Sequence, residues 1–123
     1  MKSCVGICMA LMVLSCPALA QESVHVYGGY LKGQSYLELS DASRMAYAIG
    51  IVDGLFSSGF YGANPDSIQK LQQCTNGMNS RQLTDVLDQY VRTHQARWQD
   101  PMNVLATNAL IAACPVMRAG FDN

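Results

Sequence analysis

The chain has 123 residues, with 8 basic and 9 acidic side chains and a formal net charge of −1. This length allows one domain, and the absence of any cluster of Lys and Arg argues against a nucleic acid as partner. Half of the residues are hydrophobic, but 15 of the first 20 are apolar, so the remaining chain is less hydrophobic than the average indicates.

The first 20 residues have the layout of a secretory signal peptide. Lys2 provides a positive start, residues 4–14 form an apolar run, and the Ala-Leu-Ala at 18–20 is a small-x-small cleavage signature. We therefore expect export to the periplasm, with cleavage after Ala20 and a mature chain of 103 residues.

Two alternatives remain for the same segment. An uncleaved membrane anchor needs about 20 apolar residues, and this run is shorter and is interrupted by Pro17, so we expect no stable membrane span. A lipoprotein is the other alternative, because the Val-Leu-Ser-Cys at 13–16 loosely resembles a lipobox and would make Cys16 the first mature residue. The Ala-Leu-Ala site is the better match of the two.

Residues 21–39 lack a sustained helical period and predict an irregular N-terminal arm that three glycines interrupt. A helical turn over 33–37 would place three apolar side chains on the core: Tyr36, Leu37 and Leu39. A short strand at 24–27 is an alternative for the beginning of this arm.

The segment 40–58 has the most sustained helical pattern in the mature chain. Its apolar side chains recur at steps of four, three and four: Met45, Ile49, Val52 and Phe56. Ser40 or Asp41 can cap the first free backbone N–H groups. Gly50 and Gly54 lie four residues apart on one face, where another backbone could approach closely. We therefore expect a core helix with a small-residue groove.

Two further helices are predicted after a glycine-bounded aromatic loop at 59–63. An Asn-Pro pair at 64–65 supplies a cap and a first-turn proline for a short helix that ends at Cys74. Asn79 and Gln82 form a capping-box pair at the start of the next helix. That helix combines an apolar stripe with a charged face expected to meet solvent: Leu83, Val86, Leu87, Tyr90 and Val91 on the stripe, and Arg81, Asp85, Asp88 and Arg92 on the charged face.

The last helix is predicted to start at the Asp-Pro pair at 100–101, another cap-plus-proline signal. Its apolar residues fall at i, i+3, i+4, i+7, i+8 and i+11: Met102, Leu105, Ala106, Ala109, Leu110 and Ala113. Pro115 helps to stop this helix, and residues 116–123 are expected to form a loose tail. The sequence thus predicts an all-α domain of about four helices over residues 40–115.

Three of the five cysteines lie in the signal peptide, which leaves Cys74 and Cys114 in the mature chain. An even pair in an exported protein predicts one disulfide, with two buried free thiols as the alternative. In the chain-entropy model, closing this loop of about 41 residues stabilises the fold by roughly 4 kcal/mol.

The sequence contains no recognisable catalytic or metal-binding constellation. His25 and His94 are the only histidines and no Cys-x-x-Cys occurs, so we expect no metal, no cofactor and no enzymatic activity. His94 is better explained by the favourable position of a positive charge at a helix C-terminus. Asp53 lies beside the apolar stripe and is expected to reach solvent or cap a neighbouring segment, with a buried functional acid as the alternative.

Loop residues are better candidates for function. Phe60, Tyr61 and Trp98 fall in predicted loops, and aromatic residues are enriched at protein interfaces, although they could instead fold back onto the core. Loops on a rigid scaffold often carry recognition, and aromatic and arginine residues often dominate interface energy. The candidate partner-binding group comprises Phe60, Tyr61, Asn64, Arg97 and Trp98.

An ordered set of residues spans the chain from Gly33 to Pro115. The set comprises Gly33, Tyr36, Leu37, the run of Tyr47, Gly50, Asp53 and Gly54, then Cys74, the helix start with Met78, Gln82 and Leu83, and finally Tyr90, His94, Ala109, Leu110 and Cys114. In this order it resembles the Rap/Tai immunity-protein family. These are small exported bacterial proteins that guard against peptidoglycan amidases delivered by type VI secretion.

The resemblance implies an HdeA-like helical domain and a stoichiometric mechanism. Family members, which are often dimers, occlude the active-site cleft of the amidase and catalyse no reaction, so a protein partner and a homodimer are both expected on this basis. The alternative is an HdeA-like periplasmic chaperone or envelope stress protein that binds unfolded clients at low pH, with nine carboxylates to supply the titration. An enzyme accessory or small hydrolase is a third hypothesis, with little support in the sequence.

Overall fold

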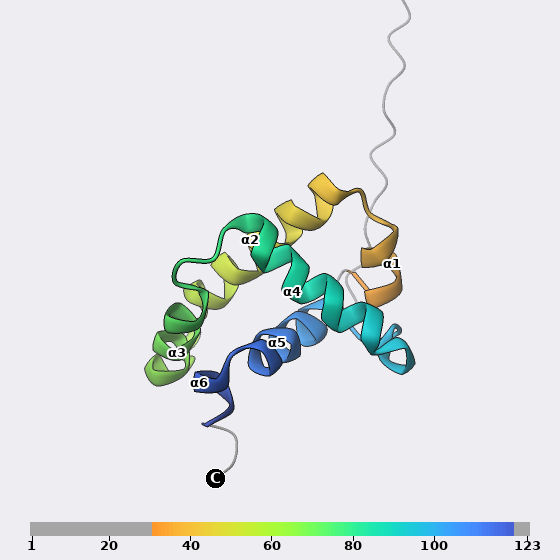
Figure 1. Ribbon diagram of the computed structural model, residues 1–123. Coiled ribbons are helices and arrows are strands. Elements are labelled where there is room, and N and C mark those ends of the chain that lie inside the picture. The colour runs from red at the N-terminus through yellow and green to blue at the C-terminus, as the bar shows by residue number, and fades with distance from the viewer. Residues whose placement is uncertain (1–30, 120–123) are drawn as a thin grey trace, which may run out of the picture.

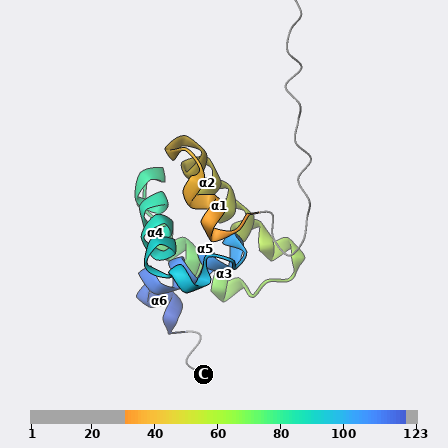
Figure 2. The same cartoon turned by 90° about the vertical axis from the view of Figure 1, so that its right-hand side faces the viewer.

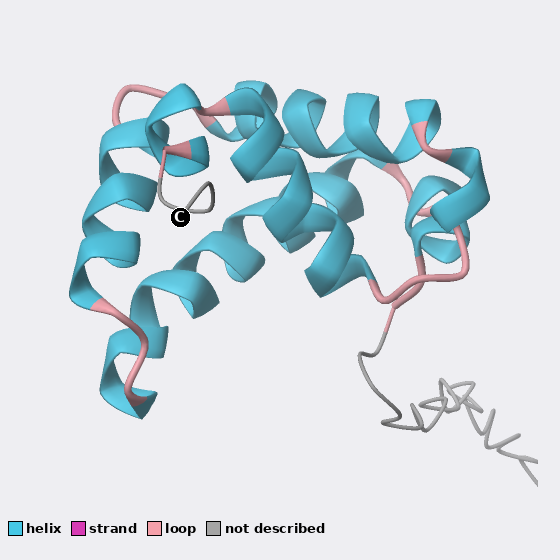
Figure 3. Ribbon diagram, turned by 90° about the horizontal axis from the view of Figure 1, so that it is seen from below, coloured by secondary structure: helices cyan, strands magenta, loops and turns pink. Residues whose placement is uncertain are grey.

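The computed structural model describes residues 31–119, whose secondary structure is helical apart from one isolated bridge between Lys32 and Pro101 (Figures 1 and 3). The α-helices of this range are α1 (Gly33–Glu38), α2 (Asp41–Ser57), α3 (Pro65–Thr75), α4 (Ser80–Thr93), α5 (Met102–Ala113) and α6 (Pro115–Arg118). Two short 3-10 helices, η1 (Ser58–Tyr61) and η2 (Gln95–Arg97), follow α2 and α4. The all-α prediction is therefore confirmed, while the signal peptide and the first ten residues of the predicted arm lie outside the described residues.

Helices α4 and α5 form the centre of the domain, and α2 packs on α4. Figure 1 shows α3 and α6 together at one end of the molecule and α1 at the other. In Figure 2, where the α1 end faces the viewer, α1 lies in front of α2. None of these helices is both long and apolar enough to cross a bilayer.

The core is built around α5, whose predicted apolar spacing is confirmed except at Ala113, which is exposed. Met102, Leu105 and Leu110 are at most 1% exposed, and Ala106 and Ala109 lie between them on the same buried face. The other large side chains that are fully buried are Tyr36 of α1 and Leu87 and Val91 of α4. Because burying a Leu or Met side chain contributes about 1.5–3 kcal/mol, this cluster supplies the main hydrophobic stabilisation.

Helix α1 is held close to the core by Gly33. A Cβ atom at this position would lie 2.6 Å from Leu105 Cδ1 and 3.3 Å from Val91 Cγ1, so glycine alone fits without displacing a neighbour. The helical turn predicted over 33–37 is thus a short helix docked against α4 and α5.

Three predicted helix starts are confirmed by side-chain caps. Ser40 caps α2 and Asn64 caps α3, each accepting a hydrogen bond from a first-turn backbone N–H. Asn79 and Gln82 form the capping box of α4, in which each side chain accepts from the backbone N–H of the other at 2.9 Å. These local bonds explain why the starts of α2, α3 and α4 are readable from the sequence.

The start of α5 differs from its prediction. Pro101 is the N-cap, and Asp100 makes an ion pair with Arg97 at 2.8 Å instead of capping the helix. The N–H of Met102 donates to the carbonyl of Leu31 at 2.6 Å. The backbone carbonyl of Leu31, just before α1, therefore accepts from a first-turn N–H of α5, where the sequence predicted capping by the Asp100 side chain.

Cys74 and Cys114 form the predicted disulfide, with their Cα atoms 5.6 Å apart. Cys74 lies in the last turn of α3, and Cys114 lies between α5 and α6. The bond thus ties α3 to the C-terminal part of the domain.

The predicted tail at 116–123 is wrong in its first three residues. Pro115 follows the end of α5, as expected, but it also begins α6, which continues to Arg118. Val116 is half-buried, and Met117 packs against the core. Apolar contact with the core therefore keeps this stretch helical.

Two predictions about α2 need correction, the first of them at Ile49. The buried residues of this helix are Ala48 and Val52, whereas Ile49 is 42% exposed. Val52 and Phe56 of the predicted stripe do face the core, and the completely buried Ala48 takes the place of Ile49 on that face. A Cβ atom added at Gly50 or Gly54 would meet no described atom within 4 Å, so no part of the chain that the structure describes packs into the expected groove.

Candidate functional site

Phe60 and Tyr61 form an exposed aromatic pair on η1. Their side chains are 90% and 91% exposed, the largest values among the bulky apolar residues described. An aromatic side chain buries about 150–250 Å² when it is covered, so two adjacent exposed rings leave a large apolar area in water.

The turn that carries this aromatic pair is fixed by its backbone. Gly62 adopts a positive φ of 90°, and its N–H donates to Gly59 O at 3.2 Å. The next N–H, of Ala63, donates to Ser58 O at 3.1 Å. The backbone at position 62 favours glycine because other residues rarely adopt this left-handed conformation. The two rings are therefore presented by a hydrogen-bonded turn between α2 and α3.

Asn64 follows the aromatic turn but has a structural role. Its Oδ1 accepts a hydrogen bond from the backbone N–H of Asp66 at 2.8 Å and so caps α3. The side chain is exposed and close to the aromatic pair in the chain. Because it caps α3, its reorientation toward a partner would cost the capping hydrogen bond.

Trp98 lies half-buried against the core. Its Nε1 donates to Val91 O at 2.8 Å, and its own carbonyl accepts from Gln34 N at 3.1 Å. The alternative that this ring folds back onto the core is therefore the one the structure has. The indole is thus held against α4, while the backbone carbonyl of Trp98 is bound by α1.

Arg97 is held by two local contacts. Its Nε donates to Asp100 Oδ2 at 2.8 Å, and its Nη1 donates to the Tyr90 hydroxyl at 3.2 Å. The guanidinium therefore orders the segment between α4 and α5.

The five predicted partner-binding residues do not form one surface. Phe60, Tyr61 and Asn64 follow the end of α2, whereas Arg97 and Trp98 lie beside α1, at the opposite end of the molecule in Figure 1. A 17-residue helix such as α2 is about 25 Å long, which sets the scale of this separation. The sequence showed that all five are loop residues, but it could not show which loops share an end of the bundle.

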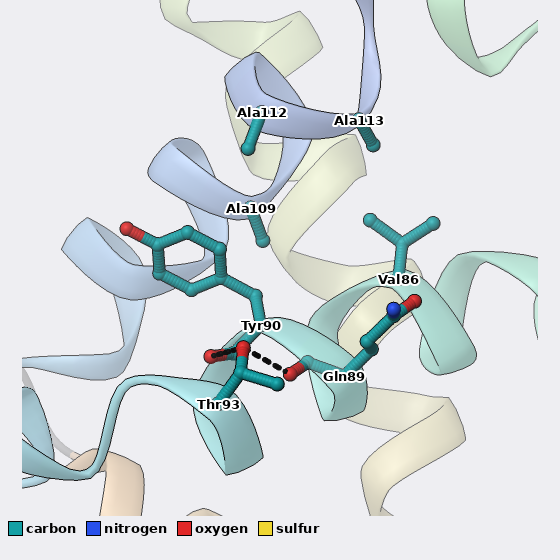
Figure 4. A pocket seen from close by; sticks show the side chains of 7 residues that line it. All are labelled: Val86, Gln89, Tyr90, Thr93, Ala109, Ala112 and Ala113. Carbon is teal, nitrogen blue, oxygen red and sulfur yellow. Dashed lines mark hydrogen bonds between the residues drawn. The ribbon is translucent and has the colours of Figure 1, made fainter.

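A groove between α4 and α5 was missed by the sequence analysis (Figure 4). Val86, Gln89, Tyr90 and Thr93 of α4 line it from one side, and Ala109, Ala112 and Ala113 of α5 from the other. Its volume of about 260 Å³ is below the 300–1,000 Å³ typical of small-molecule sites. Ala113 was predicted on the buried stripe of α5 but is exposed, so the sequence pointed away from a groove at this position.

A polar cluster of Tyr36, Arg44 and Asp88 joins α1, α2 and α4. The Tyr36 hydroxyl donates to Asp88 Oδ1 at 2.7 Å. Arg44 Nε lies 3.1 Å from Asp88 Oδ2, which is an ion pair without hydrogen-bond alignment. Arg44 Nη1 donates to Leu39 O at 2.8 Å and so ties the connection between α1 and α2 to the same cluster.

This cluster corrects the prediction that Asp88 faces solvent, because its side chain is only 18% exposed. The partners that draw it inward, Tyr36 and Arg44, are more than 40 residues away along the chain, so no local pattern indicates them. Burial, followed by the hydrogen bond to Asp88, raises the pKa of Tyr36 above its usual value. A neutral hydroxyl that donates to a carboxylate is a structural arrangement, and the cluster holds three helices together.

No group of three or more His, Cys, Asp or Glu side chains within residues 31–119 could hold a metal ion. His94 caps the end of α4, stacks on Tyr90 at 3.9 Å between ring centroids, and is exposed. Asp53 is exposed, and His25 lies outside the described residues. The expected helix-terminal position of His94 and the expected exposure of Asp53 are therefore both seen.

The remaining residues of the predicted structural motif have clear positions. Tyr47 is half-buried and meets Tyr36 edge to face at 5.6 Å, and Leu83 is buried at the start of α4. Together with the disulfide, these contacts define a small all-α domain. Comparison of the chain with protein-family models, with curated proteins and with solved structures finds no match.

Proposed function

We propose that this domain is an exported periplasmic binding protein of the immunity type, which occludes a peptidoglycan amidase effector delivered by type VI secretion. The observation that carries the proposal is the exposed pair Phe60 and Tyr61 on a hydrogen-bonded turn. The ordered residue set that resembles the Rap/Tai family supports the choice of partner. The disulfide is compatible with an oxidising compartment.

The mechanism is steric. The aromatic pair enters the substrate cleft of the amidase and covers it, and no bond is made or broken by this chain. A pre-ordered turn favours such binding because little conformational entropy remains to be lost at the interface. Aromatic side chains at the centre of an interface commonly contribute more than 2 kcal/mol each.

A capture experiment with a functional readout tests this proposal. The mature protein, immobilised through its C-terminus, is exposed to periplasmic extract of the source bacterium and of its competitors. The proposal expects capture of a peptidoglycan amidase whose hydrolysis of purified cell walls stops at one equivalent of this protein. Capture of a protein whose amidase activity is unaffected at excess would contradict it.

The chaperone hypothesis has one specific observation in its favour. Asp88 holds α1, α2 and α4 together through a hydrogen bond from Tyr36 and an ion pair with Arg44, so the packing of three helices depends on one carboxylate. A chaperone of this kind would suppress aggregation of an unfolded client at pH 3 and not at pH 7. Equal lack of suppression at both pH values would remove this alternative.

A further inference from the structure

A second concave surface lies between the end of α2 and the outer face of α3, and it has an unusual composition. Its volume is about 530 Å³, within the range of small-molecule sites and twice that of the α4–α5 groove. The lining residues come from α2, α3 and the turn after α3: Phe56, Gln69, Gln72, Gln73, Thr75, Asn76 and Gly77.

None of these lining residues is ionisable, and four of them are amides. Gln69, Gln72, Gln73 and Asn76 recur at helical spacing, so they share one face of α3 and its end. Among the described residues, these four side chains donate no hydrogen bond to protein and accept none. Each amide offers two N–H donors and a carbonyl acceptor.

Phe56 gives the surface an apolar edge. Its ring is half-buried and packs against the core, so it is held in position beside the amides. In the turn after α3, Gly77 has a positive φ of 85°, and a Cβ there would meet no described atom within 4 Å. The surface is thus bounded by a ring and by an open turn.

From this chemistry we propose that the α2–α3 surface binds a neutral oligosaccharide. A sugar presents many hydroxyl groups, each of which both donates and accepts, and it has apolar C–H faces that pack on aromatic rings. The amide row matches the hydroxyls, Phe56 matches a C–H face, and the uncharged lining imposes no desolvation penalty for a charge. This inference is independent of the proposed immunity function, because it uses none of η1.

The test is a titration of the ¹⁵N-labelled mature protein with chitotetraose, a neutral oligosaccharide. The proposal expects amide shifts confined to Phe56 and to residues 69–77. The variant Gln69→Ala/Gln73→Ala should weaken binding at least tenfold, and alanine at these exposed helical positions preserves α3. Phe56→Leu, which keeps an apolar side chain, should also weaken binding, and the melting temperature of each variant separates lost binding from lost folding.

A matched control and two competing probes make the test decisive. Gln89→Ala, an exposed glutamine in the other groove, should bind chitotetraose as the wild type does. Cellotetraose is the second saccharide, and stronger binding of chitotetraose would assign a contact to its acetamido groups. A chitotetraose concentration of about 10 mM detects even binding weaker than about −4 kcal/mol. The absence of amide shifts up to this concentration would overturn the proposal. Equal shifts with an uncharged Gly-Ser peptide would also overturn it.

Discussion

Tyr36 shows how one hydroxyl can join three helices. Its ring is completely buried in the core, and its oxygen reaches the Asp88 carboxylate at 2.7 Å. The same carboxylate neutralises Arg44, so the hydroxyl, the carboxylate and the guanidinium compensate one another's burial.

Tyr36→Phe should therefore destabilise the protein by about 1.5–3 kcal/mol, the usual loss for a hydrogen bond to a charged group. Urea unfolding at pH 7 measures this change. Tyr47→Phe is the matched control, since the Tyr47 hydroxyl makes no hydrogen bond among the described residues, and it should change stability by less than about 0.5 kcal/mol. Equal effects of the two substitutions would show that the Asp88 contact contributes nothing specific.

The raised pKa of Tyr36 also predicts a pH dependence. Tyrosine in the unfolded chain ionises near pH 10, whereas the folded state keeps Tyr36 neutral to higher pH. The stabilisation is therefore fully present below about pH 10 and is lost as the pH rises further. Thermal unfolding between pH 8 and 11 should show a steep fall for the wild type and a shallower one for Tyr36→Phe. Parallel curves for both proteins would contradict this assignment.

At the scale of the elements, the short helix α1 depends on a close contact between its first residue and the core, which the sequence did not predict. The expected small-residue groove lay at Gly50 and Gly54, yet the glycine whose added Cβ would meet the buried core is Gly33. Its neighbours Leu105 and Val91 belong to the fully buried core and have little space to move.

Gly33→Ala should consequently lower stability by about 1–3 kcal/mol, the cost of overpacking a filled core. Gly50→Ala, on the exposed side of α2, should leave stability unchanged or raise it by up to about 1 kcal/mol because alanine is the better helix former. Chemical denaturation of the two variants gives the comparison. A stabilising Gly33→Ala would mean that α1 is not docked as described.

At the scale of the whole molecule, the disulfide joins α3 to the region between α5 and α6. Replacing both cysteines by serine should destabilise the domain by about 4 kcal/mol, because the unfolded chain regains the entropy of a long loop. The melting temperatures of the oxidised protein and of the double variant measure this loss. An unchanged melting temperature would show that the bond adds no net stability.

Features of the fold that depend on contacts between residues close in the sequence could be predicted, and features that depend on distant residues could not. Capping by Asn79 and Gln82 and the apolar spacing of α5 are local, so the sequence predicts them correctly. The inward position of Asp88 and the carbonyl of Leu31 at the start of α5 depend on partners distant in the chain, so they could not be predicted. For the candidate site, the sequence identified Phe60 and Tyr61 as loop aromatics, but only the structure separates them from Trp98.

The most direct measurement of the central claim is the affinity of the captured amidase for the double variant Phe60→Ala/Tyr61→Ala. Both side chains are almost fully exposed, so the melting temperature should match that of the wild type. If the aromatic turn is the binding surface, the double substitution should weaken binding by more than about 2 kcal/mol, roughly 30-fold in Kd. Ile49→Ala, another exposed apolar position, should bind normally. Unchanged affinity of the double variant would contradict the claim that this aromatic turn is the binding surface.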